Sequence, residues 1–179
     1  MKYTLALIVL ISFSVQAQEV NWMSVEKAYE LSKTDSKPIL IDVYTDWCGW
    51  CKRMDATTFQ HAQIVEYMNK NFYAVKFDAE SPTPVTFKGQ VFSNPTYDPN
   101  KRGRNGVHEL SRMLGVNAYP TIVYFNEKFD VIAPISGYKQ PRQLQVLLTF
   151  FNEVYSSDIP SDKMQPLWDN HSATFEGTW

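Results

Sequence analysis

The sequence predicts an α/β domain, because a strand, helical segments and a second strand follow one another in its first half. Residues 39–44 and 72–78 are short apolar runs rich in β-branched and aromatic residues, as in buried strands. Residues 52–57 and 61–69 form the helical segments between them. Such a connection is right-handed and makes the two strands parallel. At 179 residues, 44% of them hydrophobic, the chain can bury one sizeable core.

The remaining elements follow from local signals. Residues 22–31 carry apolar side chains at helical spacing, with Ser24 as a candidate N-cap. We expect a helix over residues 107–114 that Gly115 ends. Two strands, 121–125 and 131–135, flank a turn, and a closing helix over 141–155 begins at a proline. The residues from 156 onward form a polar tail.

The N-terminus has the pattern of a signal peptide. A basic start, an apolar stretch over residues 5–13 and Val-Gln-Ala at 15–17 predict cleavage before Gln18. The apolar stretch is shorter than the roughly 20 residues that span a bilayer, so no stable membrane insertion is expected, although an uncleaved anchor is the alternative. We therefore expect an exported, periplasmic or secreted protein.

The only two cysteines stand in one Cys-x-x-Cys, within Trp-Cys-Gly-Trp-Cys at 47–51. An exported protein usually uses cysteines as structural staples, but a three-residue separation constrains an unfolded chain very little. At a strand-to-helix turn, the helix N-terminus would stabilise the Cys48 thiolate, and Cys51, one turn later, could resolve a mixed disulfide. Cys48 is expected to be the exposed thiol and Cys51 the buried one. An inert disulfide is the alternative; a metal site is disfavoured because the three histidines lack ligand spacing.

The chain resembles the thioredoxin superfamily over residues 20–155. Three blocks carry the resemblance: residues 41–52 around the cysteines, Val-Lys-Phe-Asp at 75–78, and Gly-Val-Asn-Ala-Tyr-Pro-Thr at 115–121. Residues 58–72 look most like the branch that includes the C-terminal domain of the periplasmic disulfide-interchange reductant conductor. The resemblance implies a thioredoxin fold, with a central mixed β-sheet flanked by helices and a hairpin-containing insertion before the third core helix.

The resemblance also divides the chain. We expect a signal peptide over 1–17, a thioredoxin-like domain over 18–156 with an insertion at 81–105, and a C-terminal extension over 157–179. Thioredoxin usually has a proline before the second cysteine and a kinking proline in the following helix. Both are absent here. The redox poise of cytosolic thioredoxin is therefore not implied.

Further site residues follow from the resemblance. Tyr119 and Pro120 match the family's cis-proline segment, which exposes backbone to substrate; a trans proline opening a strand is the alternative. Asp42 lies in an apolar strand, where burial would raise its pKa and let it accept the Cys51 proton. Lys76 occupies the matching place on the neighbouring strand and could pair with it. Alternatively, both side chains face solvent.

The residues around the thiols are expected to bind substrate. Trp47, Gly49 and Trp50 stand next to the cysteines, and indole offers flat apolar area to an extended substrate. Trp47 could equally pack on its own domain. A cation at position 50, between the cysteines, would make the disulfide more oxidising. The side chain of Trp50 is uncharged, which favours a reductant or isomerase. Lys52 and Arg53 nearby argue in the opposite direction.

Residues 81–105 contain four prolines and several basic residues, and 85–87 and 90–92 form a hairpin pattern around Lys88-Gly89. Since ligands gather where parallel strands end, we expect this insertion to rise beside the cysteines. Its hairpin edge and its cations would then form one wall of a substrate groove for an acidic partner. A surface loop without a role is the alternative.

Together these features predict a thiol–disulfide oxidoreductase that reduces or isomerises protein disulfides. No flavin or phosphate-binding motif is present, so no cofactor is expected and a membrane or soluble dithiol protein would supply electrons. A formal net charge of −2 gives no reason to expect nucleic acid as a partner. A disulfide-forming oxidase and a thioredoxin-fold binding module with little turnover remain as alternatives.

Overall fold

The structure, a computed structural model, describes residues 18–126 and 128–177. The predicted signal peptide, residues 1–17, lies outside these ranges. In the first half the elements are α1 (Val25–Ser32), β1 (Ile39–Tyr44), α2 (Gly49–Ala56), η1 (Thr58–Gln60), α3 (Ala62–Asn71) and β2 (Tyr73–Asp78). In the second half they are β3 (Val85–Phe87), β4 (Gln90–Phe92), α4 (Glu109–Met113), β5 (Thr121–Phe125), β6 (Val131–Ser136), α5 (Pro141–Thr149), η2 (Phe150–Val154) and α6 (Ser161–Thr174).

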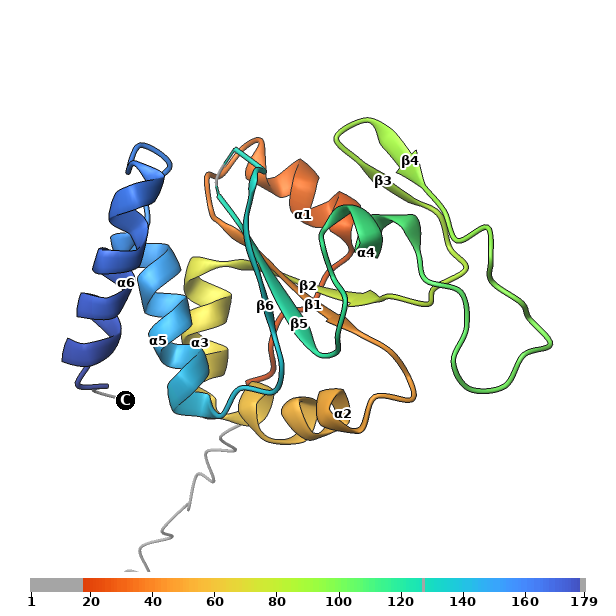
Figure 1. Ribbon diagram of the computed structural model, residues 1–179, viewed down its shortest axis with the longest axis horizontal. Helices are drawn as coiled ribbons and strands as arrows, with labels where there is room; N and C mark the ends of the chain where they lie inside the picture. Colours follow the sequence, from red (N-terminus) through yellow and green to blue (C-terminus); the bar gives the residue numbers. More distant parts are fainter. Residues whose placement is uncertain (1–17, 127, 178–179) are drawn as a thin grey trace, which may run out of the picture.

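The central sheet has the strand order β2-β1-β5-β6 (Figure 1). The first two strands are parallel, as predicted, with Asp42 directly opposite Lys76. β5 is antiparallel to β1, and β6 is antiparallel to β5. The sheet is therefore mixed, and the prediction of an α/β thioredoxin fold is confirmed.

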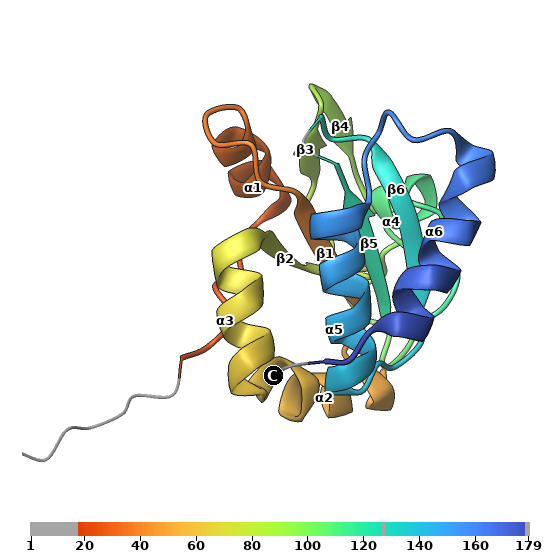
Figure 2. The ribbon, with the colours of Figure 1, turned by 90° about the vertical axis from the view of Figure 1, so that its left-hand side faces the viewer.

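Helices cover both faces of the sheet, because alternate strand residues point to opposite sides. One face carries Ile41, Val43 and Val75 and packs against α1 and the β3-β4 hairpin. The other carries Leu40 and Ala74 and packs against α2, α3 and α5. Figure 2 shows α3 and α5 side by side on this second face.

Most predicted boundaries agree with the structure to within one to three residues. Ser24 is the N-cap of α1, as predicted, and its hydroxyl accepts a hydrogen bond from the backbone N–H of Lys27. The predicted closing helix over 141–155 is interrupted: α5 ends at Thr149 and continues as a π-helical turn, η2.

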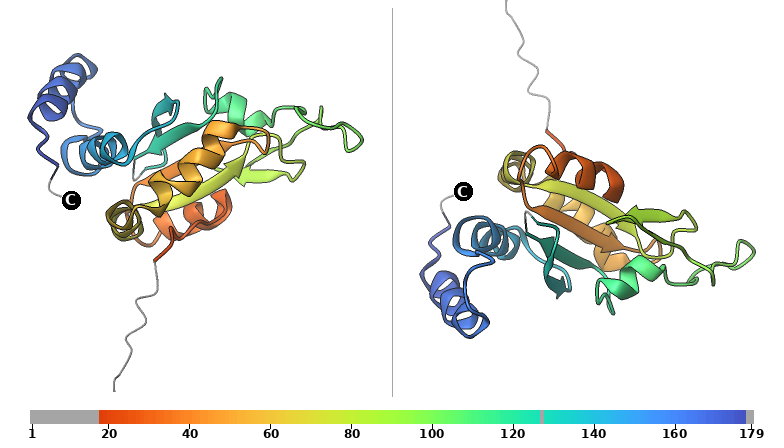
Figure 3. Two further views of the ribbon diagram at one scale, coloured as in Figure 1. Left: turned by 90° about the horizontal axis from the view of Figure 1, so that it is seen from below. Right: turned by 90° about the horizontal axis from the view of Figure 1, so that it is seen from above.

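The β3-β4 hairpin exists at the predicted residues, and both turn residues, Lys88 and Gly89, have positive φ. Its position differs from the prediction. The side chains of Val85 and Phe87 pack in the core with α1, on the face of the sheet opposite α2. The hairpin is apolar on its inner side, so burial holds it there instead of beside the cysteines. The loop after β4 extends away from the body of the molecule (Figure 3), and one of its residues, Arg104, contacts Trp47 near the start of α2.

The C-terminal region contains a helix that the sequence analysis missed. α6 lies alongside α5 and η2, with Met164, Leu167 and Trp168 packed against the core (Figure 2). The remaining positions of α6 are mainly polar, which is why the segment resembles a tail in the sequence. Within the described ranges, no helix has both the length and the apolar character needed to cross a membrane.

Candidate active site

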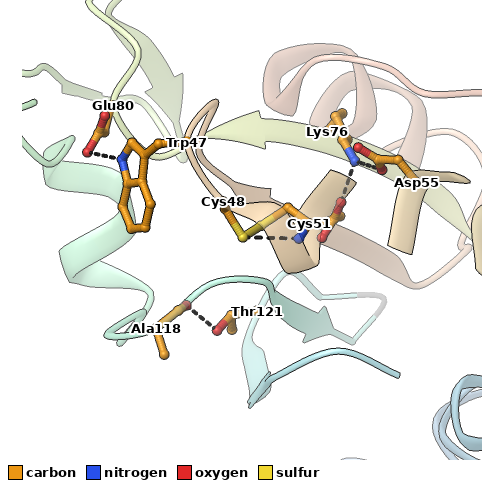
Figure 4. Close-up of a disulfide and its surroundings, with 9 residues drawn as sticks. Trp47, Cys48, Cys51, Asp55, Lys76, Glu80, Ala118 and Thr121 are labelled. Atoms are coloured by element: carbon orange, nitrogen blue, oxygen red, sulfur yellow. Dashed lines mark hydrogen bonds and ion pairs between the residues drawn. A yellow bond between two sulfur atoms is a disulfide. The ribbon is translucent and has the colours of Figure 1, made fainter. Parts of the chain in front are cut away.

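The two cysteines lie where β1 ends and α2 begins. Cys48 is the N-cap of α2, and its sulfur accepts a hydrogen bond from the backbone N–H of Cys51 at 3.1 Å. The two form a disulfide (Figure 4). A helix N-terminus places backbone N–H groups and the positive end of the helix dipole next to the first sulfur, which favours its thiolate form.

Both cysteines are buried in this oxidised state. Cys48 is 4% exposed and Cys51 is 2% exposed. The predicted contrast between an exposed and a buried thiol concerns the reduced protein and stays a prediction. The cysteines differ in their surroundings: Cys48 caps the helix beside Trp47, and Cys51 lies inside the first turn. A substrate must reach Cys48 between the side chains that rim the disulfide.

The predicted cis-proline segment lies beside the disulfide. The Tyr119–Pro120 peptide bond is cis, as the resemblance implied. The Thr121 hydroxyl donates to the Ala118 carbonyl at 2.8 Å and so closes this turn next to Cys48 (Figure 4). Tyr119 contacts Trp47 edge to face, with 5.8 Å between ring centroids.

Two aromatic pairs rim the disulfide. On one side Trp47, 37% exposed, donates its indole N–H to Glu80 Oε1 at 2.9 Å and contacts Tyr119. On the other side Trp50, 56% exposed, packs on Tyr138 with 5.5 Å between ring centroids. Gly49 separates the two sides and has open space where a side chain would project. The rim therefore offers flat apolar area next to the sulfurs; substrate binding by these residues stays a prediction.

Asp42 and Lys76 form the predicted pair beneath the disulfide. Asp42 is 1% exposed, and Lys76 Nζ donates to its Oδ2 at 2.6 Å. Lys76 also binds Asp55, which lies on α2 one turn after Cys51 (Figure 4). The alternative that Asp42 and Lys76 face solvent is wrong for Asp42.

Burial raises the pKa of Asp42 to about 6, although the ammonium of Lys76 opposes the shift. The second oxygen, Oδ1, has no hydrogen-bond partner among the described residues. Burial by itself would lower the pKa of Lys76, but its two carboxylate partners outweigh that effect and raise it. The group under the disulfide is therefore a carboxyl that can change protonation near neutral pH, held by a lysine that stays charged.

A family model described as a thioredoxin-like domain matches residues 25–152. The chain belongs to the thioredoxin-like family. The superfamily resemblance carried by the three sequence blocks is thereby confirmed.

Relatives of this thioredoxin-like chain include proteins named for disulfide chemistry. It is 26% identical over 120 residues to the disulfide bond reductase DsbH of Chlamydia pneumoniae, covering 66% of the chain and 64% of that protein. It is 28% identical over 120 residues to a protein disulfide-isomerase of Schizosaccharomyces pombe, covering 66% of the chain and 25% of that protein. A match to spermatogenesis-associated protein 20 of Rattus norvegicus, 34% identical over 60 residues, covers 34% of the chain and 8% of that protein. The chain thus spans less than two thirds of the length of these relatives.

Solved structures show the same thioredoxin-like fold. A DsbH oxidoreductase has a TM-score of 0.55 at 18% identity, with 83% of this chain and 95% of that chain covered. A putative disulphide-isomerase from Bacteroides thetaiotaomicron has a TM-score of 0.53 at 23% identity, with 79% and 100% covered.

The thioredoxin-like site contains three residues that sequence reasoning missed. Asp55 is four residues after Cys51 and so on the same helical face, a spacing that could have revealed it. Glu80 comes two residues after the end of β2, and nothing in the local sequence links it to Trp47. Tyr138 comes from the β6-α5 connection, and only the fold brings it to Trp50.

Proposed function

We propose that this chain is a thiol–disulfide oxidoreductase of an oxidising extracytoplasmic compartment, and that it reduces or isomerises protein disulfides. The observation that carries the proposal is the Cys48–Cys51 disulfide at the N-terminus of α2, next to the turn that contains Pro120, in a thioredoxin-like chain. The names of two relatives, a disulfide bond reductase and a protein disulfide-isomerase, support it.

The reaction begins with the reduced dithiol. The Cys48 thiolate attacks one sulfur of a substrate disulfide, forms a mixed disulfide and releases the other substrate sulfur as a thiolate, which takes up a proton. Cys51 then loses its proton and attacks the Cys48 sulfur. This step releases the second substrate thiol and leaves the Cys48–Cys51 disulfide, so two electrons pass from the protein to the substrate.

Asp42 is proposed as the acceptor of the Cys51 proton. Its pKa of about 6 lies near the operating pH, where a general base works best. Lys76 acts as a positioning residue, because its ammonium holds Oδ2 of Asp42 and leaves Oδ1 without a protein partner among the described residues. The substrate-binding residues are Trp47, Gly49, Trp50, Tyr119 and Pro120.

The surroundings of Trp50 favour reduction or isomerisation over oxidation. A cation between the cysteines would stabilise the Cys48 thiolate and make the pair more oxidising, and Trp50 is uncharged. The guanidinium of Arg53 lies over the rings of Trp50 and Tyr138, 5.3 Å and 5.5 Å from their centroids, and this nearby cation argues in the opposite direction. Electrons would come from a membrane or soluble dithiol protein.

A redox titration of the Cys48–Cys51 pair tests whether the protein reduces or isomerises disulfides, or forms them. We expect a reduction potential of about −180 mV or lower, the range of isomerases and reductants, and a value near about −120 mV would identify an oxidase instead. An insulin-reduction assay tests turnover. Cys48→Ser should abolish it, and equal activity of wild type and this variant would favour a binding module.

Export is tested by the mature N-terminus. When the full chain is expressed in an exporting bacterial host and recovered from the periplasm, N-terminal sequencing should begin at Gln18. Recovery only from the cytoplasm with Met1 intact would contradict the proposed compartment.

A further inference from the structure

One cation of the insertion at residues 81–105, Arg104, lies at the rim of the dithiol. The guanidinium of Arg104 lies over the ring of Trp47, 4.4 Å from its centroid. Trp47 itself is fixed from two other directions, by the hydrogen bond to Glu80 and the edge-to-face contact with Tyr119. Arg104 is thus placed on an aromatic platform that adjoins Cys48.

The loop that carries Arg104 is held in shape by its own polar groups. The buried amide of Asn94 donates to the Gly106 carbonyl at 2.7 Å. Asn105, next to Arg104, exchanges two hydrogen bonds with the backbone of Asp98, each 2.9 Å long. A side chain at Gly106 would place its Cβ 2.4 Å from Thr96 Oγ1, so the two limbs of the loop meet closely there. A loop constrained in this way loses little conformational entropy when a partner binds.

The charge of Arg104 is available to a partner. Lys101, Arg102 and Arg104 are exposed, and no ion pair is formed by them within the described part of the chain. Of these three, Arg104 is the one in contact with the rim of the site. A guanidinium that stacks on indole through its face keeps its N–H donors at the edge, where they can bind a carboxylate.

We propose that Arg104 is a specificity-determining residue, and that it selects disulfides flanked by aspartate or glutamate. The inference rests on the proposed function and names its substrate class. The substrate segment would lie on Trp47 with its carboxylates against Arg104. Two carboxylates are close to Trp47 as well: Glu80 accepts its indole N–H, and Asp46 precedes it in the chain. These carboxylates would favour basic substrates, so the test must distinguish an acidic preference from a basic one.

The test uses two oxidised peptides, each a symmetric disulfide of a short chain whose cysteine is flanked either by two aspartates or by two lysines. Fully reduced, desalted protein is mixed with each peptide, and the release of peptide thiols gives a second-order rate constant. Because the reduced protein supplies both electrons, no electron donor is needed. We expect wild type to react faster with the acidic peptide, by about three- to tenfold at low salt, and the preference to shrink as salt rises.

Variants of the loop distinguish a specific role of Arg104 from a general effect of the loop's positive charge. Arg104→Gln should abolish the preference, and Arg104→Glu should reverse it. Arg104→Lys should keep part of it, because lysine retains the positive charge but cannot stack on the indole or bind a carboxylate through two N–H groups. Lys101→Gln is the matched control: it removes one charge from the same exposed loop, and it should leave the ratio of the two rates within about twofold of wild type. Circular dichroism verifies that each variant is folded.

Two results would overturn the inference: equal rates or a basic preference in wild type, or the same loss of preference in Lys101→Gln as in Arg104→Gln. A small aromatic disulfide dye tests the proposed function separately. Wild type that reduces the dye but does not favour the acidic peptide contradicts only the role of Arg104. Wild type that fails to reduce the dye contradicts the oxidoreductase proposal, and with it this inference.

Discussion

At the residue scale, the burial of Asp42, the proposed proton acceptor, carries a local cost in stability. Its carboxyl lies in the sheet; Lys76 binds one of its oxygens, and the other has no hydrogen-bond partner among the described residues. An ionised carboxyl with an unsatisfied oxygen is unfavourable in such a place. A group that a fold retains at such a cost is a candidate for proton transfer.

The first prediction concerns resolution of the mixed disulfide. In Asp42→Asn, attack by Cys51 should slow by about 100-fold, because the variant cannot accept a proton. Rapid-quench measurement of the mixed-disulfide intermediate checks this. Asp55→Asn is the control, since it removes the other carboxylate bound to Lys76 and keeps Asp42; an equal slowing in both variants would contradict the assignment.

The second prediction concerns stability as a function of pH. The folded pKa of Asp42 is raised to about 6 from an ordinary value of 3.8, so the folded state binds the proton more tightly than the unfolded state. This contribution to stability is fully present below about pH 3.8 and is lost as pH rises through 6. Asp42→Asn should therefore be more stable than wild type by about 1–3 kcal/mol at pH 7, and the difference should shrink toward pH 4. Urea unfolding at several pH values measures it; a difference that grows on acidification would contradict the argument.

The third prediction concerns His108, a buried residue that caps α4. Its Nδ1 accepts the backbone N–H of Leu110 at 3.1 Å, so Nε2 carries the proton toward the Thr83 carbonyl, also at 3.1 Å. Desolvation lowers the pKa of His108, which keeps the ring neutral. The unfolded state then binds more protons, and stability should fall as pH drops below about 6.5, by at most about 1.4 kcal/mol per pH unit. His108→Asn keeps a capping oxygen and should remove this component, as a comparison of urea unfolding at pH 5 and pH 7.5 would show. An unchanged difference between the two pH values would exclude the role of His108.

At the element scale, α6 differs from the core helices because it is held by few side chains. Trp168 contacts Phe150 edge to face, with 5.1 Å between ring centroids, and His171 Nε2 lies 3.0 Å from the Thr149 hydroxyl. A groove of about 690 Å³ remains between α6, α5 and β6. None of the residues of α6 is fully buried. The helix therefore adds to a core that the other elements already close.

The fourth prediction follows from this packing. Trp168→Ala should lower the free energy of unfolding by about 1–2 kcal/mol, less than the loss of a fully buried indole, because the side chain is half-buried. Denaturant unfolding measures the change, and Asn170→Ala, at an exposed position of α6, serves as the control. A loss of the whole fold in Trp168→Ala would show that α6 is part of the core.

At the scale of the whole molecule, the dithiol couples redox state to stability. If the protein acts as a reductant, its oxidised form is the favoured product, and the fold must stabilise the disulfide relative to the dithiol. We expect the oxidised protein to unfold at a higher denaturant concentration than the reduced protein. A variant with Cys48→Ser and Cys51→Ser should show no response to reductant. Greater stability of the reduced form would indicate an oxidant.

The sequence by itself determined the fold class and the centre of the site. Periodicity and β-branched runs located β1 and β2, and adjacency along the chain placed Cys48 and Cys51 at the start of α2. The pairing of Asp42 with Lys76 was implied by the resemblance to the thioredoxin superfamily, and the two residues lie directly opposite each other on the parallel strands β1 and β2. These features depend on local spacing and on one supersecondary unit, both of which can be read directly from the order of residues.

Only the tertiary structure decided how distant segments meet. The hairpin packs against α1 because its inner residues are apolar, and local turn chemistry carries no information about which face of the sheet will bury them. The contact of Arg104 with Trp47 joins residues 57 positions apart through a loop without regular structure. In α6, a few apolar side chains among many polar ones acquire a partner only once α5 and η2 are in place. Each of these contacts is set by the free energy of burying surface or pairing groups across the fold, and that depends on where every other element lies.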